Sequence, residues 1–119
     1  SSDLDVEEFK HQINGFELVV IKAETQNIQD LRRLVDQRKK NQTKKCFLIL
    51  SYQDLKVVMV CGITDDLQKA LNANDVIKMI AKSIDGKGGG RRDFAQGAGE
   101  CKNFEEFVNS IPDIVQSLD

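Results

Sequence analysis

Residues 86–99, with the sequence GKGGGRRDFAQGAG, place six of the chain's eight glycines beside two arginines and a glutamine. Glycine lacks a Cβ atom, so consecutive glycines allow left-handed backbone conformations and a close approach to a ligand. Successive N–H groups can then form a concave anion site, and guanidinium groups donate well to phosphate oxygens. The stretch therefore predicts a phosphate-facing loop, and the alternative is a tight structural turn on a sheet. The candidate contact residues are Lys87, Gly88, Gly89, Gly90, Arg91, Arg92 and Gln96.

This stretch matches neither of the two common nucleotide-binding fingerprints. A Walker loop requires GxxxxGK followed by Ser or Thr, and no such residue follows a Gly-Lys pair here. The dinucleotide fingerprint opens a helix after a strand, whereas this loop is expected to follow a helix. Nucleotide hydrolysis and NAD binding are therefore poorly supported.

A second group of cations lies in residues 32–45, where seven basic residues stand against a single acid, Asp36. The whole chain has a net charge of −2, so a basic face would be a local feature. These cations could contact phosphates, or they could simply form the solvated C-terminal end of a helix. The candidates within this group are Arg32, Arg33, Arg38, Lys39 and Lys40.

Catalytic and metal-binding patterns are poorly supported. Cys46, Cys61 and Cys101 are far apart in sequence, and His11 is the only histidine, so a four-ligand zinc site is not expected. We expect three inert thiols in a reducing compartment, with Cys46 and Cys61 buried in strands. No apolar run is long enough to span a membrane, and no signal peptide opens the chain.

Short apolar runs predict three strands. Residues 16–22, 46–51 and 55–61 are rich in β-branched and large apolar side chains. The last two are separated by only three residues and should form an antiparallel hairpin. Because they are almost continuously apolar, both faces of the sheet should be covered by helices.

Three amphipathic segments predict the covering helices. Residues 28–40 repeat apolar side chains at helical spacing after a capping Asn27, and residues 76–84 do the same after Asn74. Asn103 and Glu106 stand in capping-box register, and Pro112 is expected to start a further helical segment.

The expected order is β-α-β-β-α-loop/β-α, with residues 93–96 as a short strand. This predicts an α/β (α+β) fold in which a small mixed sheet of about four strands is covered by helices. Residues 4–12 are interpreted as the last turns of an incoming helix, so that residues 1–14 form a linker with a tag remnant at Ser1 and Ser2. Residues 15–119 would then form one globular domain of a longer protein.

The glycine stretch resembles the sequence GGGGGRPDMAQAGG near the C-terminus of alanyl-tRNA synthetases, in their DHH-associated domain. The residues before it, NANDVIKMIAKSIDG, and the segment DLRRLVDQRKK also resemble that family. The likeness covers about residues 16–118. This chain has Arg92 where proline is usual and Phe94 where methionine is usual, so its loop lacks a rigid turn residue and carries an additional charge.

The resemblance implies a non-catalytic C-terminal domain that holds the outer corner of tRNA(Ala) and in some members aids dimerisation. Aminoacylation and editing would belong to other domains of a cytoplasmic parent, as would ATP and zinc, and this fragment would carry no cofactor. A possible homodimer, no membrane partner and a mainly electrostatic contact with structured RNA are expected.

Several alternatives remain open. The fragment could belong to a free-standing alanyl-tRNA editing protein. It could also be the nucleotide-binding domain of a DHH phosphoesterase, although that branch typically shows GGGH where this chain has GGGR. It could serve oligomerisation through the apolar face of residues 104–111, or that face could cover the sheet. Tyr52 and Phe94 could stack on a base, or they could belong to the core.

Overall fold

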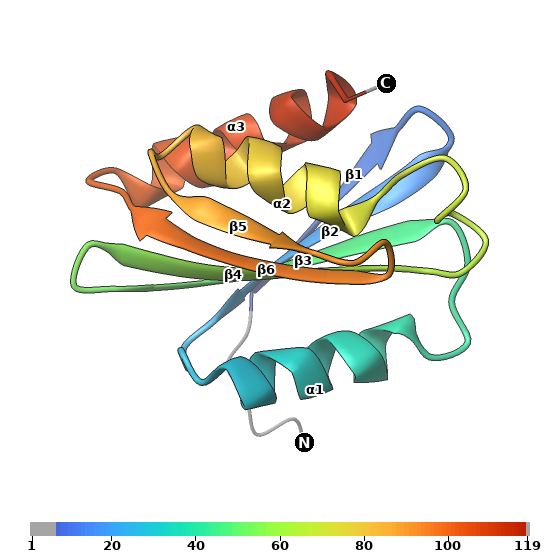
Figure 1. Ribbon diagram of the computed structural model, residues 1–119, viewed down its shortest axis with the longest axis horizontal. Helices are drawn as coiled ribbons and strands as arrows, with labels where there is room; N and C mark the ends of the chain where they lie inside the picture. The colour runs from blue at the N-terminus through green and yellow to red at the C-terminus, as the bar shows by residue number, and fades with distance from the viewer. Residues whose placement is uncertain (1–6, 119) are drawn as a thin grey trace.

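Burial on alternating sides of the strands shows that both faces of one sheet are covered. The computed structural model describes residues 7–118, which form a six-stranded sheet in the order β1-β2-β3-β4-β6-β5. Helix α1 lies on one face, and helices α2 and α3 lie on the other (Figure 1). The elements are β1 (Glu7–Ile13), β2 (Phe16–Ala23), α1 (Ile28–Lys39), β3 (Lys45–Gln53), β4 (Lys56–Ile63), α2 (Ala73–Lys82), β5 (Lys87–Gly90), β6 (Phe94–Glu100) and α3 (Phe104–Gln116).

The central strands divide their side chains between two cores. In β3, Leu48 and Leu50 join the larger core beneath α2 and α3. Phe47 and Ile49 point the other way and pack with Leu31 of α1. Successive side chains of a strand face opposite sides, so a continuously apolar strand is the expected sequence for a sheet covered on both faces.

The three strands predicted from apolar runs are confirmed. β3 and β4 form the expected antiparallel hairpin, and both residues of its turn, Asp54 and Leu55, have positive φ. β2 and β3 are parallel and are joined through α1, which is the crossover that a parallel pair requires. The mixed sheet covered by helices is therefore as predicted, although it has six strands within the described residues instead of about four.

The predicted incoming helix is wrong where the structure describes it. Residues 7–13 form strand β1, antiparallel to β2, and the remainder of the expected helix, residues 4–6, lies outside the described residues. The turn between the strands is Asn14–Gly15, both with positive φ. Asn-Gly between two extended runs is the strongest short-range hairpin signal. This turn therefore explains why residues 7–13 form a strand paired with β2 and not a helix.

The glycine stretch is a hairpin of two strands and not a loop. β5 and β6 are antiparallel, with Gly88 opposite Gly97. Helix α2 lies directly over them: a Cβ atom on Gly88 would be 2.5 Å from Cγ2 of Ile77, and one on Gly97 would be 2.9 Å from the same atom. Glycine is required here because it lets a helix approach two strands closely.

The predicted helix boundaries are partly confirmed. Asn27 caps α1, and Asn103 caps α3 by accepting from the Glu106 N–H at 3.1 Å. Helix α2 is capped by Asn72, so the prediction of Asn74 as the cap is wrong. Pro112 starts no new segment, because α3 runs through it and keeps its apolar side against the core.

Candidate nucleic-acid interface

The turn that joins β5 and β6 is fixed against the start of helix α2. The Arg91 N–H donates to the Phe94 carbonyl at 2.7 Å. The carbonyls of Arg91 and Arg92 accept from the N–H groups of Asn74 and Ala73 at 3.1 and 3.0 Å. The first N–H groups of a helix are its natural anion donors, and here two of them are used by the turn. Both arginine side chains are exposed and remain free to meet a ligand.

The glycines of β5 do not form the concave anion site predicted from their run. A strand turns successive N–H groups to opposite sides, so they cannot converge on one ligand atom. The Gly90 N–H donates to Oδ1 of Asn74 at 3.0 Å. Contacts of Lys87, Arg91, Arg92 and Gln96 with phosphate stay a prediction, and they would be made by side chains.

The hairpin exposes part of its surface on the same side of the sheet as α1. Lys87 lies opposite Ala98, which lies opposite Val58 in β4, and Val58 packs against the core beneath α1. Gln96 lies opposite Val60 of the same core. The exposed side chains of Lys87 and Gln96 therefore share the α1 face of the sheet.

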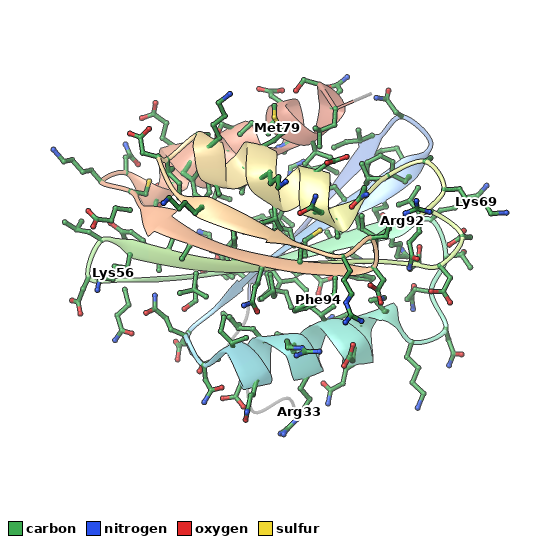
Figure 2. All side chains as sticks on the ribbon, viewed as in Figure 1. Arg33, Lys56, Lys69, Met79, Arg92 and Phe94 are labelled. Atoms are coloured by element: carbon green, nitrogen blue, oxygen red, sulfur yellow. The ribbon has the colours of Figure 1, made fainter. Side chains whose placement is uncertain are left out.

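Two of the predicted cations of α1 reach this hairpin. The Arg32 guanidinium lies 5.0 Å from the centre of the Phe94 ring. Lys39 donates from Nζ to the Asp93 carbonyl at 3.4 Å. Figure 2 shows Phe94 between the hairpin and α1, and Arg33 pointing away from the sheet on the outer side of the helix. The structure thus brings Arg32 and Lys39 together with the hairpin, although sequence spacing did not link them.

Other predicted cations are directed elsewhere. Arg38 forms an ion pair with Glu8 of β1 at 2.7 Å, at the opposite edge of the sheet. Lys40 lines a hollow of about 590 Å³ together with the acids Asp65 and Asp66. Arg92 lines a smaller hollow of about 230 Å³ on the α2 side of the turn. The predicted basic group is therefore not one continuous patch.

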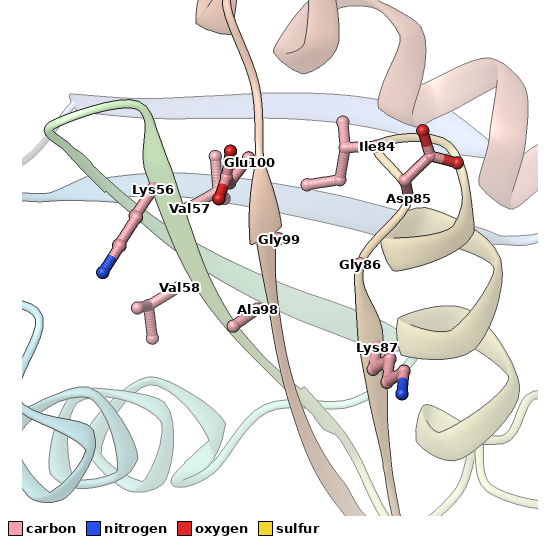
Figure 3. A pocket seen from close by; sticks show the side chains of 10 residues that line it. All are labelled: Lys56, Val57, Val58, Ile84, Asp85, Gly86, Lys87, Ala98, Gly99 and Glu100. Carbon is pink, nitrogen blue, oxygen red and sulfur yellow. The ribbon is translucent and has the colours of Figure 1, made fainter.

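A groove of about 650 Å³ opens at the far end of the hairpin (Figure 3). We call it the hairpin groove. It brings together Lys87 and Lys56, a cation that sequence reasoning missed, since Lys56 comes close only through the pairing of β4 with β6. Its lining is Lys56, Val57, Val58, Ile84, Asp85, Gly86, Lys87, Ala98, Gly99 and Glu100. The lining also includes two acids, and one of them, Glu100, lies directly opposite Lys56 in the pairing of β4 with β6.

The two aromatic residues considered for base stacking already have partners. Tyr52 stacks on Phe104 with ring centroids 4.7 Å apart, and its hydroxyl donates to the Cys101 carbonyl at 2.8 Å. Phe94 is covered on one side by Arg32. The apolar face of α3 is also occupied, because Phe107 and Ile111 are buried in the core of the same chain. Of the two alternatives for this face, the structure therefore favours the one in which it covers the sheet of its own chain.

The thiols lie where they were expected. Cys46 and Cys61 are fully buried on neighbouring strands, with their Sγ atoms 3.6 Å apart. The hydrogen bond with Cys46, together with burial, raises the pKa of the Cys61 thiol.

Within residues 7–118, no group of three or more His, Cys, Asp or Glu side chains could hold a metal ion. In the same range no helix is long and apolar enough to cross a membrane.

Comparison with known proteins decides the family. The DHHA1 domain matches residues 15–117. The chain belongs to the DHHA1 domain family. It is 35% identical over 107 residues to the alanine–tRNA ligase of Nitrosomonas europaea, covering 88% of this chain and 12% of that protein. It is 31% identical over 115 residues to the enzyme of Staphylococcus aureus, covering 96% of this chain and 13% of the relative.

The DHHA1 domain also has a solved counterpart of the same size. The crystal structure of the C-Ala domain from Aquifex aeolicus alanyl-tRNA synthetase superposes with a TM-score of 0.80 at 29% sequence identity. The match covers 91% of this chain and 98% of that domain. The chain thus spans only 12–13% of the length of the full-length relatives, but nearly all of the solved C-Ala domain.

Proposed function

We propose that this DHHA1 domain is the non-catalytic C-terminal domain of a cytoplasmic alanine–tRNA ligase and binds the outer corner of tRNA(Ala). The observation that carries the proposal is the match to the C-Ala domain, which covers 98% of that domain at a TM-score of 0.80. Adenylation and acyl transfer would then lie elsewhere in the parent, together with its ATP and zinc sites.

The RNA would lie along the α1 side of the β5–β6 hairpin. Arg91 stands at the turn, Gln96 and Lys87 follow along the exposed face, and Lys56 lies across the hairpin groove. Arg32 borders this face beside Phe94. Such a row suits a sugar–phosphate backbone, because Lys and Arg contacts to phosphate displace counterions without reading sequence. Arg92 would reach a neighbouring phosphate from the α2 side of the turn.

The proposal is tested by measuring the affinity of the chain for tRNA(Ala) over a series of salt concentrations. Replacing Arg91→Ala together with Arg92→Ala removes two cations at the turn. We expect weaker binding and a slope of log affinity against log salt that is smaller by about 2, one for each phosphate that is no longer neutralised. The matched control is Lys82→Ala with Lys102→Ala, which removes the same charge from the layer of α2 and α3 and should leave the slope unchanged.

Two results would contradict the proposal. If the native chain binds tRNA(Ala) with no salt dependence, phosphate contacts are not the basis of recognition. If the arginine variant binds as the native chain does, and Arg32→Ala with Lys56→Ala also changes nothing, the α1 side of the hairpin is not the interface.

The nature of the parent is tested separately, with the full-length protein. A ligase consumes ATP and charges tRNA(Ala) with alanine. A free-standing editing protein would instead hydrolyse mischarged tRNA without ATP, and a DHH phosphoesterase would hydrolyse a nucleotide substrate. We expect ATP-dependent charging, because both of the full-length relatives named above are alanine–tRNA ligases.

A further inference from the structure

Strand β1 is at the edge of the sheet, next to β2 alone among the described strands. Its two-residue turn at Asn14–Gly15 makes Ile13 and Phe16 a hydrogen-bonded pair, and such pairs alternate along an antiparallel ladder. The backbone groups of Glu8, Lys10 and Gln12 therefore point away from β2. A strand edge of this kind is a template for another strand.

The side chains of β1 form a sequence that is complementary to itself. Suppose that a second copy pairs antiparallel with β1 about a two-fold axis at Phe9. Phe9 then lies opposite Phe9 of the other copy, and residues equally far before and after Phe9 lie opposite each other. Glu8 then faces Lys10 of the other copy, and Glu7 faces His11. Each acid meets a basic side chain on the same face of the joint sheet, which is the arrangement that stabilises cross-strand pairs.

Neighbouring registers lack this match. An axis at Glu8 places Glu8 opposite Glu8, and an axis at Lys10 places Lys10 opposite Lys10. Registers centred between residues would put side chains from opposite faces against each other, which the pleat forbids. Of these registers, only the axis at Phe9 places an acidic side chain opposite a basic one on both faces.

Phe9, the residue on the axis, also favours contact between two copies. Phe9 is an exposed large apolar residue of the chain, at 37% exposure, with the Lys22 ammonium 5.3 Å from its ring centre. An axis at Phe9 makes a non-hydrogen-bonded pair, the type in which side chains approach most closely. On the other face, α1 covers β3 and β4 and reaches β1 through the ion pair of Arg38 with Glu8.

We propose that β1 pairs antiparallel with β1 of a second copy of this chain, about a two-fold axis at Phe9, to form one continuous sheet. The interface is isologous, so each contact occurs twice. It lies at the opposite edge of the sheet from the β5–β6 hairpin. It therefore does not rest on the proposed tRNA binding, and a dimer could expose two hairpin surfaces.

The decisive experiment mixes two variants of the whole 119-residue chain. Glu8→Lys makes both residue 8 and residue 10, which face each other across the axis, positive, and Lys10→Glu makes both of them negative. Sedimentation equilibrium is measured up to about 1 mM, the range of weak complexes. Each variant alone should dimerise at least about tenfold more weakly than the native chain. An equimolar mixture should form a heterodimer with about the native affinity.

Controls separate a disrupted interface from a disrupted fold. Lys102→Glu and Glu105→Lys change the same charges at the start of α3 and should leave the native dimer unchanged. Circular dichroism must show an intact sheet and helices in every variant. A native chain that is monomeric throughout the concentration series would overturn the proposal. So would a dimer whose affinity is the same in both β1 variants.

Cross-linking tests the register directly. With Cys101→Ser to remove the half-buried thiol, Phe9→Cys places two thiols at the axis, where the Cα atoms would be about 4.5 Å apart. That separation permits a disulfide, and oxidation with diamide should give a covalent dimer. Lys10→Cys is the matched control, because its two copies would be about 7–8 Å apart across the diagonal. Equal cross-linking of both variants would exclude the axis at Phe9.

Discussion

At the scale of single residues, one carboxylate holds a strained connection in place. Asp66 follows β4, and both of its carboxylate oxygens accept from the Lys44 backbone N–H, at 3.0 and 3.1 Å. Lys44 itself has a φ of 51°, in the left-handed region that a lysine rarely adopts. This contact lowers the pKa of Asp66 below its ordinary value of 3.8. The carboxylate thus fixes the entry into β3.

The lowered pKa of Asp66 predicts a pH-dependent contribution to stability. A carboxyl whose pKa is lower in the folded state stabilises the fold above its unfolded pKa, and the contribution is lost as the pH falls through the folded pKa. We expect Asp66→Asn to lower the melting temperature at pH 7, and the difference from the native chain to shrink as the pH falls below 3.8. Glu24→Gln, at an exposed position, is the control. A difference that stays constant over the whole pH range would contradict this role of the charge.

At the scale of elements, the hairpin of β5 and β6 depends on small residues beneath α2. Ile77 projects from the helix onto Gly88 and Gly97, so the helix axis can lie closer to these strands than side chains would normally permit. The same approach lets Asn74 reach the Gly90 N–H and lets the turn carbonyls meet the start of the helix. The glycines that predicted a phosphate-facing loop therefore produce a closely packed junction between helix and hairpin.

Adding one methyl group at this junction should destabilise the domain. Gly88→Ala would place its Cβ 2.5 Å from Cγ2 of Ile77 and 2.8 Å from the Gly97 Cα. We expect the free energy of unfolding to fall by about 1–3 kcal/mol, the usual cost of overpacking, as measured by urea denaturation.

A double-mutant cycle identifies the clash responsible for that destabilisation. If Ile77 causes the clash, Gly88→Ala combined with Ile77→Ala should cost less than the two single changes added together. Strict additivity would mean that the helix and the hairpin do not meet at this point.

The elements that sequence could predict are those whose signal is local. The apolar runs of β2, β3 and β4 and the caps Asn27 and Asn103 act within a few residues, and all are confirmed. β1 was missed although Asn14–Gly15 marks its turn, because EEFKHQI has little apolar alternation of its own. β5 could not be predicted, because a run of glycines becomes a strand only through β6 beside it and α2 above it.

The candidate site could also be predicted from the sequence only where the signal is local. The exposed arginines at the turn follow from their sequence position. The approach of Arg32 to Phe94, and of Lys56 to Lys87 across the hairpin groove, depends on which strands become neighbours. Such pairing is set by tertiary contacts, and no spacing in the sequence encodes it.

At the scale of the whole molecule, the larger core should protect two of the three thiols from reaction. Cys46 and Cys61 are buried between the sheet and α2, whereas Cys101 lies half-buried before α3. A thiol reacts as its thiolate, which burial and a raised pKa disfavour. We expect a thiol reagent to label Cys101 alone in the native chain, and all three cysteines in denaturant. Rapid labelling of all three in buffer would show that the sheet opens readily.

The strand order β4-β6-β5 also has a consequence for how the chain folds. The hairpins of β1 with β2 and of β3 with β4 join segments that are neighbours in sequence. The second partner of β4 is β6, which follows much later in the chain and places Glu100 opposite Lys56. Contacts so distant in sequence form slowly, since a long loop must close first. Until β6 arrives, an apolar edge of β4 lies open to wrong partners. Pairing of β6 with β4 covers this edge. The hairpin that carries the candidate interface therefore also ends the period in which the nascent chain is most exposed to aggregation.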